Sequence, residues 1–158
     1  MRKIAFGSSD LWAAKDRRDR AAIAATVDEI LGRALLPLPS DALVFLKPNL
    51  NNDLCALTGN STDFRLLAAV IESLQHRGYT NIIVADGPNI GTYRKGIDVL
   101  ERLGVRALCA HYGIECADLN RVPSREIQLT SGSVHVARLC LEADLFVRGG
   151  FWRNFFAR

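Results

Sequence analysis

Short apolar runs alternate with stretches of helical spacing along this chain of 158 residues, and this alternation constrains the fold more than any other feature. The runs lie at residues 4–6, 43–46, 82–85 and 145–147, and each ends at a glycine or a charged residue, as strands buried on both faces do. Such alternation favours parallel strands joined by right-handed crossovers, with helices on both faces of the sheet.

Apolar side chains recur at helical spacing in three segments between these runs. They lie at residues 23–34, at residues 67–74 before a stop at Gly78, and at residues 93–103 before a break at Gly104. Residues 105–112 can then form a short extra helix that ends at Gly113. In the strands, we expect four side chains to be almost fully buried: Val44, Phe45, Ile83 and Val84.

The stretch REIQLTSGSVHVAR predicts a β-hairpin near the C-terminus, because Ile127 and Leu129 can face Val134 and Val136 around a glycine-containing turn. The predicted fold is therefore a three-layer, Rossmann-like α/β domain, with a mostly parallel sheet flanked by helices and an appended hairpin. The length suits one domain, which we place at residues 1–150.

The amino-acid composition limits the class of protein, its expected partners and its expected location. The chain is 49% hydrophobic and 23% charged, which is typical of a globular domain with a core. The net charge is only +3 and the arginines are scattered, so nucleic acid is not an expected partner. No run approaches the roughly 18 apolar residues that span a membrane. The first 15 residues do not resemble a signal peptide, so we expect a cytoplasmic location and no membrane contact.

The four cysteines form no C-x-x-C pair, which excludes the usual zinc-knuckle and ferredoxin-type motifs, and we expect them to be buried free thiols. The three histidines stand apart from one another, so no metal ligands are assigned. The chain also lacks the common nucleotide-binding fingerprints and the G-x-S-x-G nucleophile motif.

Polar residues follow two of the predicted strands. Lys47-Pro48-Asn49 comes after residues 43–46, and Asp86-Gly87-Pro88-Asn89 comes after residues 82–85. In open parallel sheets, ligands bind beyond the carboxyl ends of the strands. If the two strands are neighbours, a cation, a carboxylate and several amides project into one crevice. The alternative is a pair of ordinary solvated turns, for which Pro, Asn, Asp and Gly are equally suited.

These residues favour a small-molecule enzyme. Lys47 would neutralise an anionic substrate, and Asp86 would act as a base or as a ligand for a hard cation such as Mg²⁺. Hydrogen bonds to the substrate would come from four further side chains: Asn49, Asn51, Thr62 and Asn89. The expected ligand is thus a small anion, alone or bound to a metal ion.

Several segments resemble, in order and spacing, the family catalogued as domain of unknown function 362 (DUF362), over residues 43–147. They are VFLKPNL, STDFRLLAAVIESLQHRGYTNIIVADGP, HYGIECADLN and EADLFV. In that family, a strand ending in K-P-N precedes a threonine-containing helix start and a strand ending in an acidic residue. The matching positions here are 47–49, 61–63 and 86–88.

The resemblance implies an association with iron–sulfur proteins, because longer members often carry ferredoxin-like 4Fe–4S modules. This chain has no cysteine arrangement that could hold such a cluster, so no cofactor is expected within it. The resemblance therefore leaves a second functional class open, a non-catalytic accessory or binding domain that serves a redox protein partner.

The chain departs from the family pattern at its end. After EADLFV the family continues with a small-residue and proline turn and a long further region, whereas this chain reads RGGFWRNFFAR. Residues 151–158 hold three of the seven phenylalanines and show neither helical nor strand periodicity. We expect a truncated or frame-shifted end, which makes the missing C-terminal half a candidate partner. A short capping helix and an aromatic docking tail are the alternatives.

Overall fold

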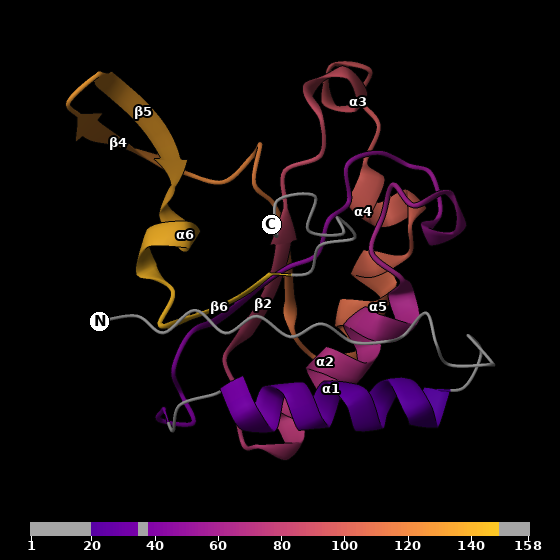
Figure 1. Ribbon diagram of the computed structural model, residues 1–158. Helices are drawn as coiled ribbons and strands as arrows, with labels where there is room; N and C mark the ends of the chain where they lie inside the picture. Colours follow the sequence, from indigo (N-terminus) through magenta and orange to yellow (C-terminus); the bar gives the residue numbers. More distant parts are fainter. Residues whose placement is uncertain (1–19, 35–37, 149–158) are drawn as a thin grey trace, which may run out of the picture.

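Four parallel strands form the centre of the computed structural model, which describes residues 20–34 and 38–148 (Figure 1). Their order in the sheet is β3-β2-β1-β6, and their bounds are Val44–Lys47 for β1, Ile82–Asp86 for β2, Glu115–Asp118 for β3 and Leu145–Arg148 for β6. The predicted strands at 43–46, 82–85 and 145–147 are confirmed. The predicted strand at residues 4–6 and the tail at residues 151–158 lie outside the described residues.

Three predicted helices are confirmed as α1 (Arg20–Ala34), α2 (Phe64–His76) and α5 (Val105–Tyr112). The segment expected as one helix at residues 93–103 is instead two short helices, α3 (Ile90–Arg94) and α4 (Val99–Arg102). Gly96 separates them with a φ of 68°, a backbone conformation that interrupts a helix. Asp98 then caps α4, because its Oδ1 accepts a hydrogen bond from the Glu101 amide at 3.0 Å.

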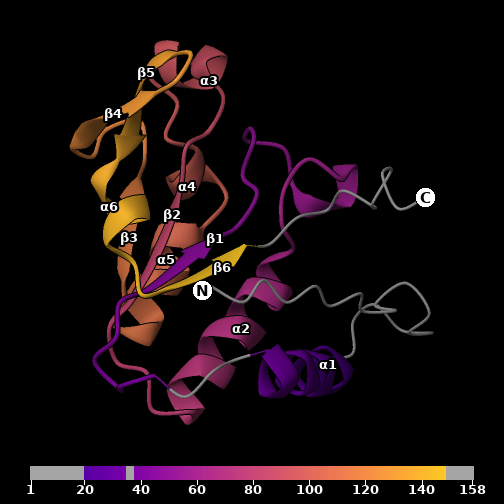
Figure 2. The same ribbon diagram turned by 60° about the vertical axis from the view of Figure 1, so that its left-hand side comes forward.

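One face of the sheet carries most of the core. Side chains of β1 and β2 pack there against α1, α2, α4 and α5, in a cluster that includes Val44, Leu46, Val84, Ile71 and Leu100. In Figure 2, α1 and α2 lie on the opposite side of the strands from α6 (Arg138–Glu142). Within the described residues, the first face thus receives several helices and the second face receives the single turn of α6.

The second face has a smaller core of Phe45, Ala85 and Ala143. Phe146 lies beside Phe45 on this face and is 46% exposed. Ile83 is only partly buried, so the expectation that it would be fully buried was wrong, whereas Val44, Phe45 and Val84 are confirmed as fully buried. Side chains alternate between faces along a strand, which places Ile83 with Phe45 on the less covered face.

The predicted hairpin is confirmed as β4 (Ser124–Leu129) and β5 (Gly132–Ala137), which form a separate two-stranded antiparallel sheet (Figure 1). Ile127 is paired with Val134 as expected, while Leu129 lies opposite Gly132.

A short 3₁₀ turn, η1 (Ala56–Thr58), interrupts the long connection from β1 to α2. No helix in the described ranges has both the length and the apolar character to cross a bilayer.

Asp63 should make the stability of α2 depend on pH. Its Oδ1 accepts a hydrogen bond from the Arg65 amide at 2.8 Å, and hydrogen bonds from the Arg65 side chain hold the pKa of Asp63 below its usual value. The stabilisation is present above the unfolded pKa of about 3.9 and is lost as pH falls through the lower folded value. We expect Asp63→Ala to lower the free energy of unfolding by about 1 kcal/mol at pH 7, measured by urea unfolding. The deficit should shrink below about pH 4, and an unchanged deficit there would contradict a charge-dependent cap.

Candidate functional site

All four parallel strands end in a charged residue at the same edge of the sheet. In the order of the strands, these residues are Asp118, Asp86, Lys47 and Arg148. Asp86 is in register with Asp118, and Lys47 is in register with Arg148. Neighbouring strands lie about 4.8 Å apart. The carboxyl edge of the sheet therefore has one half with two carboxylates and one half with two cations.

Lys47 and Asp86 meet at the centre of this edge in an ion pair between Lys47 Nζ and Asp86 Oδ1. The Leu50 amide donates a hydrogen bond to Asp86 Oδ2 at 2.6 Å. The Asp86 side chain is 3% exposed and the Lys47 side chain is 29% exposed. The structure thus brings together the two residues predicted to share the site. Because both oxygens of Asp86 accept hydrogen bonds, this carboxylate holds the lysine and the loop that follows β1.

Asn49 and Thr62 connect that loop to the start of α2. The Asn49 amide donates to Thr62 Oγ1 at 2.8 Å, and the Thr62 amide donates to the Asn49 carbonyl at 2.7 Å. The Asn49 side chain also donates to the Asn60 carbonyl at 3.3 Å. Two of the predicted ligand-binding residues therefore have a defined structural role, which is to fix the position of the loop beside Lys47.

Asn89 connects the loop after β2 to the loop after β1. Its backbone and side-chain nitrogens donate to the Asn51 carbonyl at 2.9 and 3.0 Å. Its Oδ1 accepts from the Thr92 amide at 3.1 Å, which caps α3. The side chain of Asn51 is exposed. In the third loop, Asn120 Nδ2 donates to the Pro88 carbonyl at 2.9 Å. Hydrogen bonds thus join the loops that follow β1, β2 and β3.

Arg148, Asp118 and Arg121 belong to the same edge and were not predicted. Asp118 Oδ2 pairs with Arg121 Nε at 3.3 Å, and the Arg121 guanidinium lies 5.4 Å from the centre of the Tyr93 ring. Arg148 directly follows a predicted apolar run, so the rule that selected Lys47 could have selected it. Asp118 had no such signal, because the strand it ends carries no apolar run.

Lys47 and Arg148 lie on the same face of the sheet. Phe45 and Phe146 are in register two residues earlier, and their ring centres are 4.9 Å apart in an edge-to-face contact. Because side chains two residues apart share a face, Lys47 and Arg148 lie side by side beyond these rings. Cys140 of α6 also packs on this face, and burial raises the pKa of its thiol while the nearby Lys47 ammonium opposes the rise.

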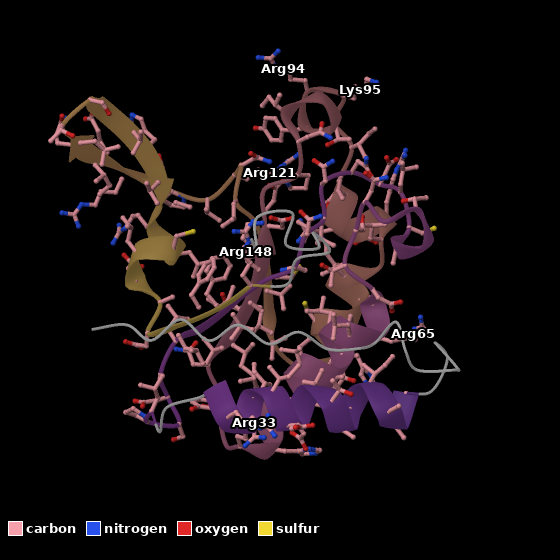
Figure 3. All side chains as sticks on the ribbon, viewed as in Figure 1. Arg33, Arg65, Arg94, Lys95, Arg121 and Arg148 are labelled. Carbon is pink, nitrogen blue, oxygen red and sulfur yellow. The ribbon has the colours of Figure 1, made fainter. Side chains whose placement is uncertain are left out.

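Figure 3 shows further basic residues at this end of the molecule. Arg94 and Lys95 lie at the tip of α3, and Arg121 and Arg148 lie below them, whereas Arg33 lies on α1 at the far end. Lys47 and Arg121 are paired with carboxylates. Arg94, Lys95 and Arg148 are exposed and form no ion pair within the described part of the chain. The carboxyl edge therefore has an excess of positive charge.

Residues 20–34 and 38–148 contain no group of three or more His, Cys, Asp or Glu side chains that could hold a metal ion. All four cysteines are free thiols. Cys109 is buried and Cys116 and Cys140 are partly buried, but Cys55 is exposed, so the expectation of four buried thiols was wrong for Cys55. Cys55 lies in the loop before η1, which the core does not cover.

Comparison with known proteins gives one result. The sequence model of the family described as "Domain of unknown function (DUF362)" matches residues 44–148, which is more than half of the chain and includes all four parallel strands and the hairpin. Searches of curated proteins and of solved structures returned no significant match. The residues of the carboxyl edge, from Lys47 to Arg148, fall inside the matched region. The chain therefore belongs to the DUF362 family.

Proposed function

We propose that this protein binds a small molecule bearing a phosphate or carboxylate group at the carboxyl edge of its parallel sheet. The observation that carries the proposal is the position of Lys47 and Arg148, which are in register on neighbouring strands and share one face. Like charges on adjacent strands oppose each other, and an anion between them would relieve that repulsion.

Lys47 and Arg148 would contribute differently to binding. The ammonium of Lys47 is held in place by the buried Asp86 and offers a point charge. The exposed guanidinium of Arg148 is planar and can donate two parallel hydrogen bonds to a carboxylate or phosphate. Because Asp86 already neutralises Lys47, the uncompensated charge of Arg148 should supply most of the attraction for the anion.

An enzymatic role would follow if a bound anion competed with Asp86 for the hydrogen bond that Lys47 donates. An anion that takes a hydrogen bond from the lysine would free Asp86 Oδ1, and the freed oxygen could accept a proton or bind Mg²⁺. Asn51, whose side chain is exposed, would contribute a hydrogen bond to the ligand. Asn49, Thr62 and Asn89 would act by holding the loops. Lys47 and Asp86 would thus be the catalytic pair of a small-molecule enzyme.

A second candidate is a non-catalytic accessory domain, for example of an iron–sulfur or other redox protein. The observation that favours it is the sparse cover that the described residues give to the second face, where Phe146 is 46% exposed, and the exposure of Leu141 on α6, which is 38% exposed. Exposed large apolar side chains occur on surfaces that contact another protein. In this case the carboxyl edge would bind no small anion.

Amide chemical shifts distinguish the two candidates. Inorganic phosphate and acetate would be titrated separately into the ¹⁵N-labelled protein, each with and without Mg²⁺. We expect the shifts to centre on residues 47–51, 86–89 and 146–148, since these surround the two cations. A larger response in the presence of Mg²⁺ would support a metal-bound anion. Shifts spread evenly over the surface, with both anions, would contradict a binding site at this edge.

A further inference from the structure

Cys109 and Cys116 lie close together at the contact between α5 and β3, which is separate from the carboxyl edge. Cys109 is on the buried side of α5 and is 1% exposed, and Cys116 packs against the same core from β3. The connection is short: Gly113 ends the helix with a φ of 67°, and the Ile114 amide donates to the Cys109 carbonyl at 3.0 Å. This turn directs β3 back along α5, so that both thiols lie in the same core at the contact between the two elements.

The charged residues around the pair are Arg106, Asp98 and Glu101. Arg106 lies three residues before Cys109, on the same side of α5, and both Nε and Nη2 of its guanidinium are 2.9 Å from Asp98 Oδ2. Hydrogen bonding with Cys109 lowers the pKa of Cys116, whereas burial raises it. The positive charge of Arg106 also lowers this pKa, and the negative charges of Asp98 and Glu101 raise it. The hydrogen bond to Cys116 and burial raise the pKa of Cys109.

The two thiols are therefore unequal. Cys116 is the one that ionises first, and it is also the more exposed of the two. A thiolate, and not a thiol, is the nucleophile in thiol oxidation. Cys109 is protonated, buried and adjacent, which is the position of a resolving thiol. Neither Cys55, in the loop before η1, nor Cys140, on α6, belongs to the α5–β3 contact.

We propose that Cys109 and Cys116 form a peroxide-sensitive dithiol that closes to an intramolecular disulfide. The Cys116 thiolate attacks one oxygen of hydrogen peroxide, the O–O bond breaks, and the leaving hydroxide takes a proton to become water. Cys116 is then a sulfenic acid. The Cys109 sulfur loses its proton and attacks the sulfenic sulfur, and the S–O bond breaks as a second water leaves. The two thiols are oxidised by two electrons and one peroxide is reduced to two waters.

Peptide mass spectrometry after peroxide treatment tests this proposal. The full-length protein would be treated with hydrogen peroxide, alkylated and digested without reduction. We expect one cross-linked species that joins the peptides of Cys109 and Cys116, and a fall in free thiols from four to two. Cross-linking of any other pair, or alkylation of Cys109 and Cys116 to the same extent as before peroxide, would overturn it.

Variants assign the roles of the two thiols. Cys109→Ala should leave Cys116 as a sulfenic acid that dimedone traps, whereas Cys116→Ser should abolish both the cross-link and dimedone labelling at position 109. Cys55→Ser and Cys140→Ser are matched controls and should keep the cross-link. Dimedone labelling of Cys109 in the Cys116→Ser variant would contradict the assignment of Cys116 as the attacking thiol. The unmodified protein still decides the proposal if a variant fails to fold.

Discussion

Replacing Phe45 with alanine should lower the free energy of unfolding by about 3 to 5 kcal/mol. Phe45 is fully buried on β1, with β2 and β6 on either side. The other fully buried members of the second-face core, Ala85 and Ala143, are small, and the larger side chains around them, such as Leu139, are only partly buried. Such a core can fill only part of the space that the ring leaves. The loss should therefore include both the transfer of the ring and the cavity left behind. Guanidinium unfolding followed by far-ultraviolet circular dichroism measures it.

Phe146→Ala is the matched control for this prediction. Phe146 is in register with Phe45, is the same type of residue and contacts the same ring, but it is 46% exposed. We expect it to cost no more than about 1.5 kcal/mol, because much of its surface is already in water and no closed cavity forms. Equal losses of stability for the two variants would contradict the difference in burial between Phe45 and Phe146.

Lys47→Met should lower the free energy of unfolding by about 3 to 5 kcal/mol, because it leaves Asp86 buried without its cation. Of the two groups in the described ranges that donate to this carboxylate, only the Leu50 amide would then remain. Asp86→Asn should cost less, because the Lys47 side chain is 29% exposed and can turn toward water. Replacing both residues by apolar ones of similar size should recover most of the loss, since a buried ion pair often adds little net stability.

Arg148→Met is the control for the lysine. It removes a cation at the paired position of the neighbouring strand, but Arg148 is exposed and unpaired within the described residues. We expect its effect on unfolding to stay within about 0.5 kcal/mol. Chemical unfolding of the four variants at pH 7 gives the comparison. A Lys47→Met loss as small as that of Arg148→Met would contradict the role of the ion pair in holding the edge.

The central strands and the pairing of Lys47 with Asp86 could be predicted because each follows from a local pattern. Apolar runs marked β1, β2 and β6, and parallel neighbours necessarily place their carboxyl ends together. β3 could not be found in this way. It lies at the edge of the sheet, where Glu115 is exposed and Cys116 and Ala117 are only partly buried, so it needs no apolar run.

The burial of Ile83 and the position of Arg148 depend on tertiary structure, which a local sequence pattern does not predict. Ile83 was expected to be buried like Val84, but the burial of each face depends on which helices cover it, and the second face receives little cover from the described residues. Similarly, Arg148 belongs to the site only because β6 lies next to β1 in the sheet. That order of strands places a second cation beside Lys47, and sequence spacing alone does not give it.

The affinity for inorganic phosphate in two charge variants tests the proposed anion site most directly. Arg148→Gln removes the exposed cation of the carboxyl edge, and Arg33→Gln removes an exposed cation at the far end of the molecule (Figure 3). We predict binding at least about tenfold weaker in Arg148→Gln, as expected for the loss of the charge-assisted hydrogen bonds that the guanidinium donates, and unchanged in Arg33→Gln. Equal affinities of the unmodified protein and Arg148→Gln, or equal weakening in both variants, would contradict an anion site at the carboxyl edge.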